Sequence, residues 1–211
     1  MIFNIILSVP ILLANISNPF FALGFYSLWG SFIALGSHIF SIIACNRDGW
    51  FKVAYISTEI SYAVNWIVVL IFWLYLVPVG LQRGEDSGVE FPTSMLVYQG
   101  CLHAIPLLTT ISDLWMTDMA LEKSHTWIAF VVMFPCYMMA NWGVATLVRD
   151  TGTIYEVEDW NNNPGTTMFV FFLAGIAQAF IFWISCAILD WIYPKRADEE
   201  FNLKAEEENT I

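Results

Sequence analysis

Charged residues are scarce in this chain. Only 13% of its 211 residues are Asp, Glu, Lys or Arg, whereas a soluble domain carries about 25%. Lys and Arg together number 8 against 19 acidic residues, which gives a net charge of −11. No stretch of the chain gathers basic side chains. Because binding to nucleic acid requires a basic patch, this composition excludes nucleic acid as a partner.

The chain also lacks paired cysteines. Its four cysteines show no CxxC spacing, and all lie within apolar segments, at Cys45, Cys101, Cys136 and Cys186. We therefore expect buried thiols that act as small hydrophobic residues, and no disulfide framework. There is no internal repeat and no second, polar domain. Neither a metal site nor a cofactor motif is found, and we expect none.

What the chain has in excess is apolar surface. Hydrophobic residues make up 58% and aromatic residues 17% of the sequence, and the mean hydropathy is +0.62. Five apolar segments each exceed the ~20 residues that a membrane-spanning helix needs. They are Phe20–Cys45, Lys52–Val79, Pro92–Met116, Thr126–Val148 and Thr166–Tyr193. The pattern predicts an all-α, polytopic transmembrane helix bundle.

The two ends of the chain differ from this bundle. Residues 1–15 are apolar but short, so the expected alternatives are a sixth, thin span, a re-entrant segment or an interfacial helix. Residues 1–194 are expected to form a single transmembrane domain, followed by an acidic tail at 195–211. Six Lys and Arg residues fall on the side of the tail and two on the other side. The positive-inside rule therefore predicts a cytoplasmic C-terminus.

Several polar side chains interrupt the apolar segments. At about 1.5 Å per residue, those at similar depth group into two layers. The outer layer holds Ser27, Asn141, His103 and Gln178, and the inner layer holds His38, Glu59 and Asp113. An ionisable side chain at membrane depth costs several kcal/mol unless it is paired or wetted, so each layer is a candidate functional site.

His103 is the central candidate of the outer layer. Gln99 precedes it by four residues and shares its helix face. A neutral imidazole can act as a general base, and Ser27 is a hydroxyl at matching depth that can act as the nucleophile. Asn141 or Gln178 can donate to an oxyanion. The alternative is that all of these residues form hydrogen bonds that hold helices together.

The inner layer is open to two interpretations. His38 and Glu59 are expected to pair, with Asp113 joining them or reaching toward the cytoplasmic face. Such a chain is typical of proton relays, but also of ion pairs that fix helix register. His38 and His103 differ in depth by about 10 Å, which disfavours one haem bound by both. His125 and the loop sequence EVEDW are expected to face solvent.

Four stretches carry a resemblance to a known family. They are FYSLWGSF at 25–32, YAVNWIVVLIFWLYL at 62–76, GCLHAIPLLTTISDL at 100–114 and TGTIYEVEDWNNNPGT at 151–166. In their order and spacing the chain resembles the androgen-induced and androgen-dependent TFPI-regulating proteins, and the related Rolling stone-like proteins.

The resemblance implies a function. Family members of known activity are membrane-embedded threonine hydrolases that cleave fatty acid esters of hydroxy fatty acids. It assigns the base to His103 and the nucleophile to Ser27, which stands where the family has threonine, and it matches Asp113 to an acid ten residues after the histidine. Rolling stone-like relatives are linked instead to myoblast fusion.

We therefore expect a membrane lipid ester hydrolase, with membrane lipids as its partners. One alternative is a non-enzymatic multi-pass protein, such as an accessory subunit with membrane-protein partners. The other is a small transporter or proton relay through His38, Glu59 and Asp113. Oligomeric state and the identity of the membrane do not follow from the sequence.

Overall fold

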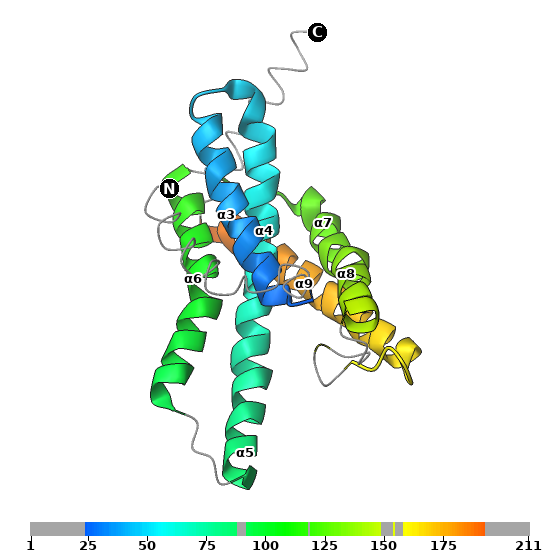
Figure 1. The fold of residues 1–211 in the computed structure, drawn as a ribbon. Coiled ribbons are helices and arrows are strands. Elements are labelled where there is room, and N and C mark those ends of the chain that lie inside the picture. Colours follow the sequence, from blue (N-terminus) through cyan, green and yellow to red (C-terminus); the bar gives the residue numbers. More distant parts are fainter. Residues whose placement is uncertain (1–23, 88–91, 118, 149–153, 155–157, 193–211) are drawn as a thin grey trace.

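A computed structural model gives the architecture (Figure 1). It describes residues 24–87, 92–117, 119–148, 154 and 158–192. The expected N-terminal segment 1–15 and the acidic tail 195–211 lie outside these residues. Within the described part the chain is helical and has no strand, which confirms the all-α prediction. The elements are α3 (Tyr26–Ala44), η1 (Asp48–Trp50), α4 (Phe51–Ile71), η2 (Phe72–Leu76), α5 (Val77–Ser87), α6 (Thr93–Thr117), η3 (Lys123–His125), α7 (Thr126–Val131), η4 (Val132–Tyr137), α8 (Met138–Gly143), η5 (Val144–Val148) and α9 (Pro164–Ile192).

Four helices are long and apolar enough to cross a membrane. They cover Tyr26–Ala44, Phe51–Gln82, Lys123–Val148 and Pro164–Ile192, close to four of the five expected spans. The remaining one forms α6, a helix of 25 residues. It is not among the four helices of membrane length and hydropathy. The structure thus supports a helical membrane protein and leaves a fifth span to be established.

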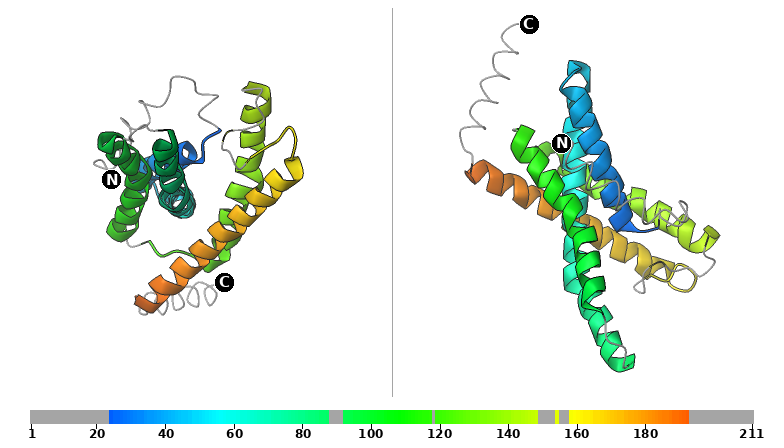
Figure 2. Two further views of the ribbon diagram at one scale, coloured as in Figure 1. Left: turned by 90° about the horizontal axis from the view of Figure 1, so that it is seen from below. Right: turned by 60° about the vertical axis from the view of Figure 1, so that its left-hand side comes forward.

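The helices pack as two groups. In the first, α3 and α4 form an antiparallel pair, and α6 packs on both. In the second, α9 lies along α7 and η4. Figure 2 shows that α9 crosses α4 obliquely. The two groups meet at α4 and also at the start of α3, where Tyr26 contacts Gln178 and Tyr137. Buried residues form two hydrophobic clusters, one around Tyr62, Leu114 and Phe182, the other around Tyr26, Tyr137 and Phe171.

Local sequence explains how the helices begin and approach one another. Helix α9 begins at Pro164, where the missing N–H of proline costs nothing. The hydroxyl of Thr167, in its first turn, accepts a hydrogen bond at 2.8 Å from the backbone N–H of Asp159, which precedes the helix. Gly30 lets α4 come close to α3, because a Cβ there would meet Asn65 Oδ1. Pro135 interrupts the helix of the α7–α8 region, and Phe134 beside it has non-helical φ and ψ.

Much of the outer surface is apolar. Trp115, Leu147 and Trp191 are 77%, 76% and 82% exposed. Exposed apolar surface on this scale is typical of contact with lipid rather than water. The expectation of buried thiols is correct for Cys186 and wrong for Cys45, Cys101 and Cys136, which are exposed. They lie on outward faces because an apolar surrounding lipid removes the penalty for leaving a small hydrophobic residue outside.

Candidate functional site

His103 lies on α6 with its imidazole held from two sides. Nδ1 lies 2.7 Å from the carbonyl oxygen of Gln99, and the ring stacks on Phe72 with centroids 4.1 Å apart and an interplanar angle of 12°. The residue is only 8% exposed. A carbonyl can only accept, so in the neutral ring Nδ1 carries the hydrogen and Nε2 keeps its lone pair. Gln99 therefore takes part through its backbone carbonyl.

Ser27 lies in the first turn of α3 and is half-buried. Its backbone carbonyl accepts a hydrogen bond from the Ser31 hydroxyl at 3.1 Å. Among the described residues, no hydrogen bond joins Ser27 to His103. The structure does not bring the expected nucleophile and base into contact.

The register of the helices nevertheless puts both residues at one level. Asn65 Nδ2 donates to the Gly30 carbonyl at 3.2 Å, so these two residues lie side by side on α4 and α3. Because the two helices are antiparallel, Ser27, three residues before Gly30, lies beside Val68, three residues after Asn65. On the other side of α4, the Ser61 and Thr110 hydroxyls lie 2.7 Å apart. Because α4 and α6 are also antiparallel, His103, seven residues before Thr110, lies at the level of Val68, seven residues after Ser61. Ser27 and His103 are therefore level with the same residue of α4.

Asn141 and Gln178 are engaged in helix-to-helix hydrogen bonds. The amide nitrogen of Gln178 donates to the Ala129 carbonyl at 2.9 Å, and its oxygen accepts from the Tyr26 hydroxyl at 2.5 Å. Asn141 Nδ2 donates to Glu158 at 3.0 Å and lies 3.4 Å from the Gly24 carbonyl. Both residues therefore contact the chain just before Ser27, and each amide nitrogen already donates to a backbone or carboxylate oxygen.

Glu158 was expected to face solvent, and this expectation is wrong. It is 3% exposed and also accepts the backbone N–H of Ile154 at 3.1 Å. The Trp160 indole N–H donates to Asn141 Oδ1 at 2.8 Å. Glu158 and Trp160 thus point inward, because the amide of Asn141 within the membrane segment needs polar partners and these two side chains supply them. The signal in the sequence was Trp160, a large apolar residue inside a polar loop.

The inner layer separates into two pairs. His38 Nδ1 lies 3.3 Å from Asp113 Oδ2, and the Ser41 hydroxyl donates to the same oxygen at 3.1 Å. Both members of the pair are 0% exposed. His38 Nε2 and Asp113 Oδ1 are buried without a hydrogen-bond partner. Asp113 lies about 15 Å along α6 from His103, too far to orient the His103 ring. Its partner is His38 instead.

Glu59 does not pair with His38, contrary to expectation. It accepts from His125 Nδ1 at 2.5 Å and from the backbone N–H of Glu122 at 2.6 Å. His125 is half-buried, 20% exposed, so the expectation that it is solvated is also wrong. The cause is the connection between α6 and α7, which buries Met119 and Leu121 and brings His125 onto α4. The fold rather than the depth of Glu59 selected its partner.

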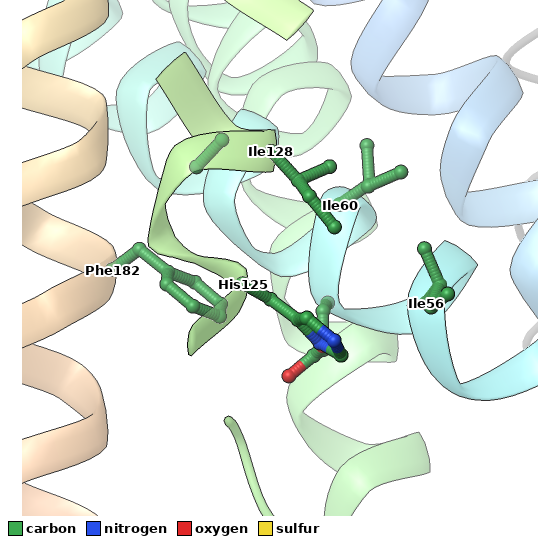
Figure 3. A pocket seen from close by; sticks show the side chains of 7 residues that line it. Ile56, Ile60, His125, Ile128 and Phe182 are labelled. Atoms are coloured by element: carbon green, nitrogen blue, oxygen red, sulfur yellow. The ribbon is translucent and has the colours of Figure 1, made fainter. Parts of the chain in front are cut away.

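The pair borders a small cavity of about 10 Å³, room for one water molecule at most (Figure 3). The lining side chains are Ile56, Glu59, Ile60, His125, Ile128, Ala129 and Phe182. A wider, open groove of about 400 Å³ lies at the turn between α3 and α4 and includes Arg47 and Trp50. Neither of these contains Ser27 or His103. No group of three metal-ligating side chains occurs among the residues that the structure describes.

Comparison with known proteins finds no matching protein family, no matching curated protein and no matching solved structure. The class of protein therefore follows from the fold itself. Four helices of membrane length, apolar outer faces and ionisable pairs buried between helices define an all-helical integral membrane protein.

Proposed function

We propose that the chain is a membrane-embedded lipid ester hydrolase in which His103 is the general base and Ser27 the nucleophile. The observation that carries the proposal is the state of His103: its Nδ1–H donates to the Gln99 carbonyl, which leaves the Nε2 lone pair available. Two further points support it. Ser27 on α3 and His103 on α6 are level with the same residue of α4, and the chain resembles membrane threonine hydrolases. Five spans are part of the proposal, with α6 as the fifth.

The reaction would follow the general route for acyl transfer. The Ser27 oxygen attacks the ester carbonyl carbon while His103 Nε2 takes the hydroxyl proton. The tetrahedral intermediate expels the alcohol, to which Nε2–H returns the proton. A water molecule, deprotonated by the same nitrogen, then cleaves the acyl-enzyme and regenerates the Ser27 hydroxyl.

Labelling with a lipid-tailed fluorophosphonate tests the nucleophile. We expect the purified protein to be labelled, Ser27→Ala to abolish labelling, and His103→Ala to slow it by roughly 10²- to 10⁴-fold. Ser31→Ala is the matched control, because Ser31 lies one turn along the same face and its hydroxyl bonds its own helix. Labelling that survives Ser27→Ala unchanged overturns the assignment and favours the non-enzymatic alternative.

The fifth span has its own test. In a cysteine-free background, single cysteines at Asp86 and Thr117 lie near the two ends of the α5–α6 hairpin. If α6 crosses the membrane, an impermeant maleimide reaches them from opposite sides of sealed vesicles. Reaction from the same side shows that α6 does not cross.

A second candidate function rests on a different observation, the open Nε2 of His38 and Oδ1 of Asp113 at either end of a buried pair. An imidazole can receive a proton at one nitrogen and release it at the other, so the pair supports a proton relay. Proton flux into dye-loaded proteoliposomes is expected to vanish in Asp113→Asn and persist in Glu59→Gln. The absence of flux above empty vesicles, or equal loss in both variants, contradicts the relay.

A further inference from the structure

The long helix that begins at Phe51 changes its winding where it faces His103. Residues Phe72–Leu76 form a π-helical turn between α4 and α5. A π turn holds an extra residue, so the side chains that follow are rotated relative to an uninterrupted α-helix, and such turns are frequent at functional sites. The position of this turn is therefore a feature to be explained.

Two consecutive aromatic residues of the π turn contact α6. Phe72 is buried and stacks on His103, and Trp73 lies against Gly100. A Cβ at Gly100 would lie 3.3 Å from Trp73 Cζ2, so a glycine there allows the close approach. The Phe72 and Trp73 rings also meet edge to face at 5.2 Å. In a regular α-helix, side chains of adjacent residues point about 100° apart and do not share a neighbour so readily.

These contacts restrict the imidazole of His103 in different ways. The Gln99 carbonyl fixes which nitrogen carries the hydrogen, and the Phe72 ring covers one face of the imidazole. The remaining freedom of the side chain is rotation about its χ angles, and a parallel stack at 4.1 Å opposes it. An aromatic face also attracts a cation, so the stack persists when the base takes up a proton.

We infer that Phe72, at the start of the π turn, is a positioning residue: its stacked ring holds the His103 imidazole in the orientation in which the Gln99 carbonyl keeps the Nδ1–H tautomer and the Nε2 lone pair stays available. The inference rests on the proposed function for its catalytic meaning. Its geometric content concerns the state of the His103 ring and can be measured without any substrate.

Nitrogen NMR of the ¹⁵N-histidine-labelled full-length protein in detergent tests the geometric content. The chain has only three histidines, so His38→Gln and His125→Gln assign the signals. At about pH 8, well above the ordinary histidine pKa of about 6.5, we expect a single Nδ1–H tautomer for His103. A mixture or the Nε2–H form in the wild-type protein overturns the inference, whatever the variants show.

Variants at Phe72 test its role. Phe72→Leu keeps apolar bulk and removes the ring, and we expect mixed tautomers at His103. Phe72→Tyr keeps the ring and should retain the wild-type pattern, as should the control Trp73→Leu, which removes the neighbouring ring. An unchanged His103 spectrum in Phe72→Leu overturns the inference.

Ester hydrolysis then separates positioning from the proposed function. We expect Phe72→Leu to lower kcat by roughly ten- to hundredfold with KM unchanged, because the base is misplaced while the substrate surface remains. If the wild-type protein has no esterase activity but the tautomer pattern behaves as expected, the proposed function fails and the positioning role stands. Unchanged kcat in Phe72→Leu contradicts the positioning role itself.

Discussion

Two histidine–carboxylate pairs lie at one level of α4 and differ in how completely their atoms are bonded. Ser61 and Thr110 lie side by side on the antiparallel helices α4 and α6. Asp113, three residues after Thr110, is therefore level with Thr58, three residues before Ser61 and next to Glu59. His38–Asp113 is closed off between α3 and α6, with one unpartnered atom on each member. In His125–Glu59, just before the start of α7, both carboxylate oxygens of Glu59 accept a hydrogen bond.

The difference separates two uses of the same chemistry. His125–Glu59 fastens a connection, since the Glu122 backbone and the His125 ring both attach to one carboxylate. His38–Asp113 joins two helices that are not consecutive in the chain, and it fixes the register of α6 against α3. A buried pair of this kind can fix helix register or take part in proton transfer.

The largest effect is expected from breaking the fully buried pair His38–Asp113. His38→Ala leaves the Asp113 carboxylate buried with only the Ser41 hydroxyl as partner, and we expect a loss of about 3–5 kcal/mol in the free energy of unfolding. The measurement is titration with SDS in mixed micelles. The double variant His38→Leu with Asp113→Leu removes both charges and should recover most of the loss. Equal loss in the single and double variants contradicts this account.

Breaking the bonded pair should cost less. Glu59→Leu leaves the Glu122 N–H and the His125 ring without an acceptor near the edge of the bundle, for an expected loss of about 2–3 kcal/mol. Glu59→Gln retains one acceptor oxygen and should lose about half as much. The same SDS titration checks both. The comparison is reversed if Glu59→Leu proves more harmful than His38→Ala.

A smaller effect is expected at Ser41. Its hydroxyl donates to the Asp113 oxygen that also faces His38, and Ser41→Ala removes this bond, for a loss of about 1–2 kcal/mol. Ser37→Ala is the matched control, because the Ser37 hydroxyl is equally buried but bonds the Ala34 carbonyl of its own helix. A larger loss at Ser37 than at Ser41 would show that the bond to the carboxylate is not what matters.

The smallest effect is expected at the exposed pair Lys123–Asp190, whose side chains are 48% and 47% exposed. Solvent screens such a pair, so Lys123→Ala and Asp190→Ala should leave unfolding unchanged within error. The titration at low and high salt provides the check. A clear loss at low salt that disappears at high salt would show that this pair stabilises the fold despite its exposure.

The sequence predicted the helices better than their partners. Long apolar segments require helices in a membrane, and four of the predicted spans match helices of membrane length to within a few residues at most ends. Only Phe20–Cys45 is clearly longer than its helix, which begins at Tyr26. For the segment around His103, helicity was predicted correctly, while its crossing of the membrane stays a prediction.

Depth alone could not predict the polar contacts. Counting residues gives the level of a side chain along the helix axis but not the direction in which it points. Thr58 and Glu59 are adjacent in level, yet Glu59 meets His125 from a connection that appeared solvated. Likewise His38 was matched with Glu59, when the neighbour at its level on α6 was Asp113. The missing information was which helix lies against which face.

The helix of 32 residues from Phe51 to Gln82 has a geometric consequence. At about 1.5 Å per residue it is a rod of about 48 Å, while the hydrocarbon layer is about 30 Å thick. Ordinary tilts of up to about 40° do not absorb the difference. One end must therefore extend beyond the hydrocarbon layer, while the π turn that packs against His103 belongs to the same continuous helix.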